Sequence, residues 1–382
     1  MSAALRVLHV ATGNLYGGVE VFLHSLARQG GSAGMASEFS VCWSRGRLAD
    51  ELRATGAPVH DLGEVRLSRP WQVWRARHRL ARVVQERRFD VAVLHSAWTH
   101  ALLGPVLRRA GMPLVMGVHT LIPRRSRLER WARWTPLEGV FANSRFTADS
   151  ARNWYPGHPE AELFYLPIEA PPPVSDAERM ALRQSLGVGS DDCVILQASR
   201  MQSLKGQRTL LAALARLKTQ PGWQCWLAGG AQRPTEQAYL EELEAFAKAE
   251  GLLNRVRFLG QRGDIPSLLA AADIVCQVNE EPEAFGLVYV EAMAAGKPVI
   301  AANQGGVAEV LDAGSGALLP AGSVDPLVAT LEQWIVDPPL RLRLGAAGRV
   351  RAASQCDLRT QLRAFHALLA RMAATKKIRA EV

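Results

Sequence analysis

The stretch Asp273-Ile-Val-Cys-Gln-Val-Asn-Glu-Glu-Pro-Glu-Ala-Phe-Gly-Leu-Val-Tyr-Val-Glu-Ala-Met-Ala-Ala-Gly-Lys-Pro-Val-Ile-Ala301 begins and ends in short apolar runs rich in Val and Ile. Such runs favour strands, whereas the longer apolar run between them has the length of a helix. We therefore expect strands at residues 273–277 and 298–301 and a helix at 287–295. Two strands joined through a crossover helix pair in parallel, so this stretch predicts an open parallel α/β sheet.

Strands and helices alternate in the same way over most of the chain. Before residue 168 we expect strands at residues 6–11, 39–43, 90–95, 113–118, 139–143 and 161–166, with helices at 19–29, 70–87 and 99–110. Beyond residue 190 we expect further strands at 193–199, 224–228 and 255–259, with helices at 207–217, 235–249 and 265–271. The run Val91-Ala-Val-Leu94 is apolar on both faces, which is typical of a strand covered by helices on both sides.

A proline-dense segment, Leu166-Pro-Ile-Glu-Ala-Pro-Pro-Pro173, separates the two series of strands. Proline lacks the backbone N–H, so the segment continues neither a helix nor a central strand and is interpreted as a hinge. We expect one domain over residues 1–168, a second over 169–355, and a helix over 356–382 that packs back on the first. The predicted fold class is α/β, with two Rossmann-like, doubly wound parallel-sheet domains facing a cleft, where the carboxyl ends of such strands bind ligands.

The composition is typical of a globular protein, since 48% of the 382 residues are hydrophobic and 21% are charged. This balance excludes a disordered chain. The sequence contains no run of 18 apolar residues and no basic start followed by a long apolar stretch, so we expect neither a membrane-spanning helix nor a secretory signal. Five scattered cysteines without a Cys-x-x-Cys pair indicate reduced thiols, and we expect a cytoplasmic protein.

Two loops at predicted strand ends carry residues suited to anion binding. Gly17 and Gly18 stand between a strand and a helix, where backbone N–H groups can approach an anion and the helix dipole favours it. Their spacing is not that of the dinucleotide fingerprint, and a plain tight turn is an equal alternative. Arg200 and Lys205 follow the strand at 193–199 and can converge on one diphosphate, Arg as a fork and Lys as a point charge. A solvated loop with two unrelated surface charges is the alternative for this pair.

Two carboxylates, Glu283 and Glu291, lie eight positions apart around the helix start predicted at Gly286. The backbone N–H groups of the first helical turn would face the ligand and could hold anionic oxygens. Glu283 would lie in the loop and Glu291 more than one turn into an otherwise apolar helix, where an unpaired carboxylate is costly. An acidic surface loop is the alternative, but it does not explain Glu291.

Taken in order, Gly17-Gly18-Val19-Glu20, Arg200-x4-Lys205 and Glu283-x7-Glu291 with the trailing Gly-Lys-Pro-Val-Ile resemble the motifs of retaining GT-B glycosyltransferases of family GT4. The match runs from the first strand to about residue 312 and covers nearly the whole chain. The resemblance implies a transferase that moves a sugar from a UDP- or GDP-sugar to a hydroxyl of a glycan or lipid-linked acceptor. It also implies assembly of a cell-envelope polysaccharide or lipopolysaccharide as the process, with the donor held mainly by the C-terminal domain.

The same resemblance implies roles for individual residues. Arg200 and Lys205 should bind the donor diphosphate and stabilise the leaving phosphate. Glu283 should contact hydroxyls of the transferred sugar, and Glu291 should hydrogen-bond the ribose. His119 matches the family's N-domain active-site histidine, although a lone histidine at a strand end is more often structural. The implied catalytic residues are His119, Glu283, Arg200 and Lys205, and the implied donor-binding residues are Gly17, Gly18, Arg200, Lys205, Glu283, Ala284, Phe285, Gly286, Leu287, Val288 and Glu291.

No Asp-x-Asp triplet and no His or Cys set with metal-ligand spacing occurs in the sequence. We therefore expect no cofactor and no metal, with Arg200 and Lys205 in place of a divalent ion. The family implies retention by front-face attack, with the leaving phosphate assisting deprotonation of the acceptor. The chain departs from the family at Val278-Asn279, where a Pro-Ser pair is usual, and at the hinge after Pro167. These departures bear on nucleotide preference and hinge geometry.

The net charge of +9 is concentrated in the first half, where residues 1–170 hold 22 Arg against 14 acidic side chains. Residues 66–152 contain 17 of these Arg, five acids and five of the ten Trp, with a sixth Trp just beyond: Trp71, Trp74, Trp98, Trp131, Trp134 and Trp154. Segments 70–84 and 123–134 resemble basic, Trp-bearing helices suited to an anionic membrane surface, which would place the protein peripherally on the inner face of the cell membrane. A solvated Arg-rich face over core Trp is the alternative. No nucleic-acid-reading module is recognisable, so we expect no nucleic acid partner.

Two other classes of function stay open on the sequence. A nucleotide-sugar epimerase of the same architecture would isomerise the donor without any acceptor. A non-catalytic nucleotide-sugar or membrane-binding protein would bind the donor without transfer or hydrolysis.

Overall fold

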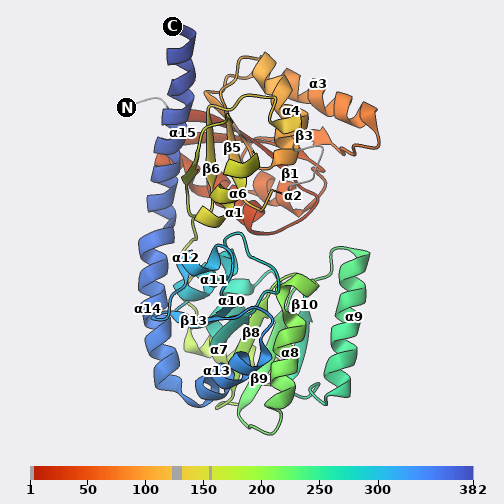
Figure 1. The fold of residues 1–382 in the computed structure, drawn as a ribbon, viewed down its shortest axis with the longest axis vertical. Helices are drawn as coiled ribbons and strands as arrows, with labels where there is room; N and C mark the ends of the chain where they lie inside the picture. The colour runs from red at the N-terminus through yellow and green to blue at the C-terminus, as the bar shows by residue number, and fades with distance from the viewer. Residues whose placement is uncertain (1–3, 123–130, 155–156, 382) are drawn as a thin grey trace. The chain divides into compact units, whose positions relative to one another are not determined.

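The computed structural model describes residues 4–122, 131–154 and 157–381, whose contacts divide them into two compact units (Figure 1). The N-terminal unit comprises the chain as far as Glu169 together with the segment from Leu358 onward, and the C-terminal unit runs from Ala170 to Asp357. Each unit contains one sheet whose paired strands are all parallel. The predicted α/β class with two parallel-sheet domains is confirmed.

The N-terminal sheet has seven strands in the order β3-β2-β1-β4-β5-β6-β7. The chain reverses its direction of growth between β1 and β4, which in open α/β sheets is the usual place for a ligand site. Its strands are β1 (Leu5–Thr12), β2 (Met35–Cys42), β3 (Val59–Gly63), β4 (Val91–Leu94), β5 (Leu114–Val118), β6 (Gly139–Ala142) and β7 (Ala161–Leu163). Its helices are α1 (Gly18–Gln29), the short η1 (Gly30–Ala33), α2 (Arg47–Ala54), α3 (Pro70–Glu86), α4 (Ala97–Arg109), α6 (Arg145–Trp154) and α15 (Leu358–Glu381).

The sequence pattern predicts neither α2 nor β3. Edge strand β3 buries only one side chain fully, that of Leu62, so it lacks the double apolar face of the central strands. Helix α2 has eight residues and turns a narrow stripe inward, formed by Leu48, Ala49 and Leu52. Most of the helix expected over residues 123–134 lies outside the described residues, which leave out 123–130.

The last helix, α15, packs within the N-terminal unit, beside strand β5 and the short helix η1. Phe365 of this helix is fully buried. Its ring centroid lies 5.4 Å from that of Phe22, 5.2 Å from that of Phe141 and 4.8 Å from that of Phe164. The final helix therefore completes the aromatic core on one face of the N-terminal sheet.

The C-terminal sheet has six strands in the order β10-β9-β8-β11-β12-β13 and reverses between β8 and β11. Its strands are β8 (Cys193–Ala198), β9 (Trp223–Ala228), β10 (Val256–Gly260), β11 (Ile274–Gln277), β12 (Val299–Ala302) and β13 (Gly316–Leu319). Its helices are α7 (Asp176–Ser185), η2 (Ser203–Lys205), α8 (Gln207–Arg216), α9 (Pro234–Ala249), α10 (Ile265–Ala271), α11 (Leu287–Ala294), α12 (Val307–Val310), α13 (Val324–Val336) and α14 (Pro338–Cys356).

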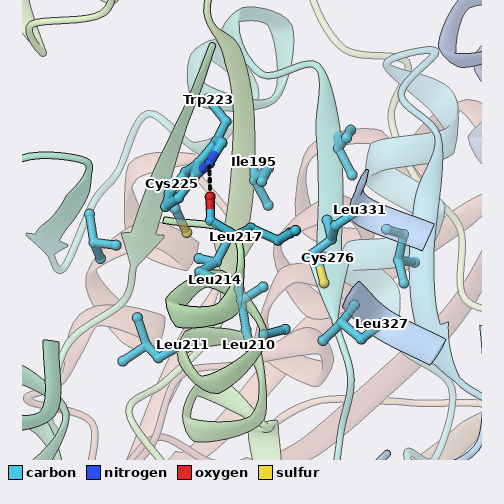
Figure 2. Packing of buried hydrophobic residues seen from close by; sticks show 14 of the residues in the cluster. Ile195, Leu210, Leu211, Leu214, Leu217, Trp223, Cys225, Cys276, Leu327 and Leu331 are labelled. Carbon is cyan, nitrogen blue, oxygen red and sulfur yellow. Dashed lines mark hydrogen bonds between the residues drawn. The ribbon is translucent and has the colours of Figure 1, made fainter. Parts of the chain in front are cut away.

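The core of the C-terminal unit lies between the sheet and helices α8 and α13. Figure 2 shows Leu210 and Leu214 of α8 beside Ile195 of β8, with Leu327 and Leu331 of α13 on the other side of the cluster. The Trp223 indole N–H, buried in the same core, donates to the Leu217 carbonyl oxygen at 3.1 Å. This core fixes strand β8, whose carboxyl end carries the predicted diphosphate loop.

All five cysteines are buried free thiols, in agreement with the predicted reduced state. Burial raises the pKa of Cys193 and of Cys356 to about 12, so these thiols stay protonated near neutral pH. Among the described helices, none is both long enough and apolar enough to cross a membrane.

Candidate active site

The loop that follows β8 is shaped by Gly206. This residue has a φ of 72°, and a Cβ at this position would lie 1.9 Å from the carbonyl oxygen of Val278. Only glycine combines the left-handed conformation with so close an approach. The loop is thereby held against the end of β11, the neighbouring strand in the sheet. Lys205, the residue before this glycine, reaches the loop that follows β11.

Lys205 and Glu283 are in direct contact. The Lys205 Nζ lies 2.5 Å from Glu283 Oε2, and the Asn279 side-chain amide donates to the same oxygen at 2.8 Å. The side chains of Lys205 and Glu283 are 17% and 20% exposed, so the pair is shielded from water without being fully enclosed. The Glu283 carbonyl also accepts from the Gly306 N–H at 2.8 Å. Two predicted site residues that are 78 positions apart in the sequence are thus brought together at the carboxyl ends of adjacent strands.

Arg200 is held by a carboxylate that the sequence analysis did not single out, that of Glu236. The Arg200 Nη1 lies 3.2 Å from Glu236 Oε1, and the Gln202 side-chain amide donates to the same oxygen at 2.6 Å. The second oxygen of Glu236 accepts from the Gln232 backbone N–H at 2.6 Å. Glu236 is 3% exposed. Its only signal in the sequence is an acidic residue in the first turn of α9, a common surface position.

Helix α11 begins after Gly286, whose left-handed backbone forms the N-cap. The Tyr289 hydroxyl donates to the Gln277 carbonyl oxygen at 2.9 Å and so fixes the helix against β11. Leu287 and Val288 form the first turn, where backbone N–H groups have no acceptor within the helix. Ala284 and Phe285 precede the cap, and Phe285 is buried. The helix start agrees with the position that the sequence predicts.

Glu291 lies five residues into α11, between the buried Val290 and Ala292. Within the part of the chain that the structure describes, no group hydrogen-bonds its carboxylate. Burial raises the pKa of Glu291 to about 7, because the charged form has lost water without gaining a partner. An unpaired, partly buried carboxylate is an acceptor prepared for hydroxyl donors from a ligand.

In the N-terminal unit, Gly17 and Gly18 form the start of helix α1. Gly17 is the N-cap in an extended conformation, and its N–H donates to Glu20 Oε2 at 2.8 Å. In this structure, therefore, an acidic side chain of the first turn occupies the N–H that was predicted to face the diphosphate. Gly18 opens the helix.

His119 follows strand β5 directly and is 6% exposed. Its carbonyl oxygen accepts from the Asn143 side-chain amide at 3.2 Å, and Asn143 is in turn held by Thr147 at 2.9 Å. Burial lowers the pKa of His119 to about 4, so its ring is neutral near pH 7. The predicted residues thus fall into two groups: Gly17, Gly18 and His119 in the N-terminal unit, and Arg200, Lys205, Glu283 and Glu291 in the C-terminal unit. Among the described residues, no cluster of three or more His, Cys, Asp or Glu side chains has the geometry of a metal site.

The family models that match this chain cover both units. The model described as "Glycosyl transferases group 1" matches residues 178–351, and that described as "Glycosyltransferase Family 4" matches residues 16–168. The chain is 30% identical to the GDP-mannose-dependent alpha-(1-6)-phosphatidylinositol monomannoside mannosyltransferase of Mycolicibacterium smegmatis over 311 residues, 74% of this chain and 77% of that relative. It is 27% identical over 299 residues to a mannosyltransferase of Corynebacterium glutamicum that acts on the monoacylated form, covering 73% and 75% of the two chains.

A solved structure shares both the fold and part of the sequence. HepE of Anabaena, determined in complex with UDP and glucose, superposes with a TM-score of 0.85 at 26% sequence identity. The alignment covers 96% of this chain and 99% of that structure.

Proposed function

The chain belongs to the GT4 family of glycosyltransferases and uses a nucleotide-sugar donor, and from this premise we propose a retaining, metal-independent transfer to a glycan or lipid-linked hydroxyl. The observation that carries the proposal is the contact between Lys205 and Glu283. A cation and a carboxylate from two separate loops meet at the point where the C-terminal sheet reverses its order. A diphosphate and the sugar attached to it need these two kinds of group side by side.

Transfer breaks the bond between the anomeric carbon and the diphosphate oxygen, and the electron pair leaves with the diphosphate. The acceptor oxygen bonds to the anomeric carbon on the same face, and its proton passes to the leaving phosphate. Negative charge therefore grows on the phosphate, where Arg200 and Lys205 stabilise the transition state more than the ground state. We assign these two cations the role that a divalent ion has in other transferases.

Lys205 and Glu283 must separate, at least in part, when the donor binds. A diphosphate carries more negative charge than the Glu283 carboxylate and accepts through several oxygens, so it competes well for the Lys205 ammonium. Glu283 then has an oxygen available for a hydroxyl of the transferred sugar, while Asn279 still orients the carboxylate. The first turn of α11 would hold phosphate or sugar oxygens, and Glu291 would accept from the ribose hydroxyls. Gly17, Gly18 and His119 would act on the same substrates from the N-terminal unit.

The nucleotide is proposed to be UDP or GDP. The mannosyltransferase relatives are named for GDP-mannose, whereas HepE was determined with UDP. A thermal-shift panel of nucleotide diphosphates and their sugars distinguishes these bases, because a ligand at 100 times its Kd stabilises the folded protein by about 2.7 kcal/mol. A shift with one base only, lost in Lys205→Ala and kept in Lys218→Ala, supports the proposal. Lys218 is an exposed lysine of the same unit. If none of the nucleotides raises the melting temperature, the result contradicts the proposed site.

We further propose that the N-terminal unit meets an anionic membrane carrying the acceptor, with the protein peripheral on the cytoplasmic face. Helix α3 buries Ala76 and Leu80 but leaves Trp71 and Trp74 57% and 62% exposed. Arg75 is exposed on the same helix. Exposed Trp beside Arg suits the boundary between lipid headgroups and acyl chains. The alternative, in which these Trp belong to the core, is not supported by the exposure of Trp71 and Trp74.

Vesicle binding by the full chain tests the membrane proposal. Binding to vesicles with anionic lipid should exceed binding to zwitterionic vesicles, weaken with salt, and fall in the Trp71→Ala, Trp74→Ala double variant. Leu342→Ala is the control, since Leu342 is an even more exposed apolar residue, on α14. Binding that does not depend on lipid charge, or that is unchanged in the double Trp variant, would contradict a membrane role for the Arg-rich and Trp-rich surface.

A further inference from the structure

Three histidines and a serine form a diagonal row on one face of the N-terminal sheet. Parallel pairing aligns Ser37 with Val7, His9 with Val93, and Val93 with Val115. Since residues two apart on a strand share a face, Ser37, His9, His95 and His119 all lie on that face. Each step from β2 to β1, β4 and β5 also advances two residues toward the carboxyl ends of the strands. The row therefore leads from the sheet interior to its ligand-binding edge.

The side chains of this row are hydrogen-bonded end to end. Ser37 Oγ lies 3.3 Å from His9 Nε2, His9 Nδ1 lies 3.0 Å from His95 Nε2, and His95 Nδ1 lies 3.1 Å from His119 Nε2. The three histidines are 0%, 5% and 6% exposed. The last ring nitrogen, His119 Nδ1, is buried and has no partner among the described residues. We call this row the histidine chain.

Burial keeps the histidine chain neutral. It lowers the pKa of His9 to about 3, that of His119 to about 4, and that of His95 well below its ordinary value. Each neutral ring carries one N–H and one lone pair, so the choice of tautomer in one ring fixes the choice in the next. The histidine chain consequently has two arrangements, in which the hydrogen bonds run in opposite directions.

The two arrangements differ in the number of ring N–H groups that have an acceptor. If the hydrogen bonds run from His119 toward Ser37, all three ring N–H groups donate, and only a lone pair at His119 Nδ1 lacks a partner. If they run the other way, His119 Nδ1 carries a buried N–H without an acceptor. Orphaned buried N–H groups are rare in proteins, because such a donor has lost its hydrogen bonds to water without gaining another, whereas unused acceptors are less rare. The first arrangement is favoured.

We infer that His95 and His9 are positioning residues that hold the proton of His119 on Nε2 and leave Nδ1 as an acceptor for a sugar hydroxyl. This inference rests on the proposed function for the identity of the hydroxyl, but not for the tautomer. Gly117 makes the arrangement possible, since a Cβ there would lie 2.6 Å from His119 Nε2. The rings of Phe22 and Phe141, with centroids 6.2 and 5.6 Å from that of His119, shield it from water.

Nitrogen-15 NMR of the full chain with labelled histidine tests the tautomer directly, because protonated and unprotonated ring nitrogens have different chemical shifts. In the wild-type protein His119 should carry its proton on Nε2. The His9→Phe substitution removes the far end of the histidine chain without changing His119. In this variant the His119 signals should move toward a mixture of tautomers. His100→Gln is the control. His100 is a buried histidine of the same unit that is hydrogen-bonded to the Thr135 carbonyl and is not part of the histidine chain.

Protonation of His119 on Nδ1 in the wild-type protein overturns the inference, and so does a His119 tautomer that is unchanged in a folded His9→Phe protein. The wild-type measurement stands even if that variant does not fold. Transfer assays form a separate arm. His95→Phe should lower kcat at least tenfold, and His95→Asn should recover most of it, because the Asn Oδ1 takes the place of His95 Nδ1 and can accept from His119 Nε2. Absence of transfer in the wild-type protein would refute the proposed function while leaving the tautomer result intact.

Discussion

Replacing Glu291 by Gln should make the ligand-free protein more stable and the nucleotide complex weaker. The Glu291 carboxylate lies within helix α11 without a hydrogen-bond partner among the described residues, and burial raises its pKa from 4.5 to about 7. Gln has almost the same shape but no charge. The substitution therefore removes the cost of a poorly solvated carboxylate and, with it, the group proposed to receive the ribose hydroxyls.

The size of the stabilisation follows from the pKa difference between the folded and unfolded states. At about 1.4 kcal/mol per pH unit, a rise from 4.5 to 7 corresponds to a loss of about 3 kcal/mol in the wild-type protein above pH 7. This is an upper limit, since the side chain is partly exposed. The sign is that of an acid whose folded pKa is raised: the folded state binds more protons between pH 4.5 and 7, so wild-type stability falls as pH rises through that window. The advantage of Gln should be near its maximum at pH 8 and below about 1 kcal/mol at pH 5.

Urea unfolding at pH 8 and pH 5 measures the first effect, and calorimetric titration with the nucleotide chosen by thermal shift measures the second. Loss of a hydrogen bond to a charged acceptor costs about 1.5–3 kcal/mol, so affinity at pH 8 should fall about 10- to 100-fold. Glu281→Gln is the control, because Glu281 is an exposed carboxylate of the preceding loop. A Glu291→Gln protein that is less stable than wild type at pH 8, or equally changed at both pH values, would refute the reasoning.

Three further substitutions test the geometry of the C-terminal unit. Lys205→Ala should lower kcat at least 100-fold with the fold intact, because the leaving phosphate loses a cation, and equal turnover in this variant would sink the assignment. Glu236→Gln should lower the free energy of unfolding by about 1–3 kcal/mol and raise the donor KM, since one oxygen that Arg200 and Gln202 share is lost; an unchanged KM would separate Glu236 from the site. Gly206→Ala should destabilise the protein well beyond Gly222→Ala, because both glycines have φ near 75° but only at Gly206 would the Cβ meet backbone, 1.9 Å from Val278; similar losses in the two variants, measured by denaturation, would show that the close approach relaxes.

The fold could be predicted from the sequence because its central strands are apolar on both faces. The runs that form β4 and β11 are completely buried, and a buried parallel strand leaves an unmistakable pattern. Edge strand β3 and the amphipathic helix α7 have no such pattern, since each of them buries only one residue fully. Helix α7 does carry a capping box, in which Ser175 accepts from the Glu178 N–H and the Glu178 carboxylate accepts from the Ser175 N–H.

The site was predictable only where a residue's type was unusual for its place in the chain. Glu291 interrupts an apolar helix and Lys205 precedes a glycine at a strand end, so both attract attention in the sequence. Glu236 and His95 do not, because an acid in a first helical turn and a histidine after a strand are ordinary. Their importance comes from side chains that only folding brings near, Arg200 in one case and His119 in the other.

The two carboxylates of the proposed site, Glu283 and Glu291, differ in their partners before the donor binds. Glu283 is paired with Lys205, so the ligand-free protein has a charge-balanced surface there. Glu291 is unpaired, and its raised pKa of about 7 means that a proton neutralises it part of the time. Donor binding exchanges the first partner for a diphosphate and gives the second carboxylate the hydroxyl donors it lacks. If this is correct, binding at pH 6 should be accompanied by proton release, since the ribose hydroxyls favour the ionised form of Glu291. Proton release should therefore fall toward zero above pH 8 and vanish in Glu291→Gln, which titration in buffers of different ionisation enthalpy measures.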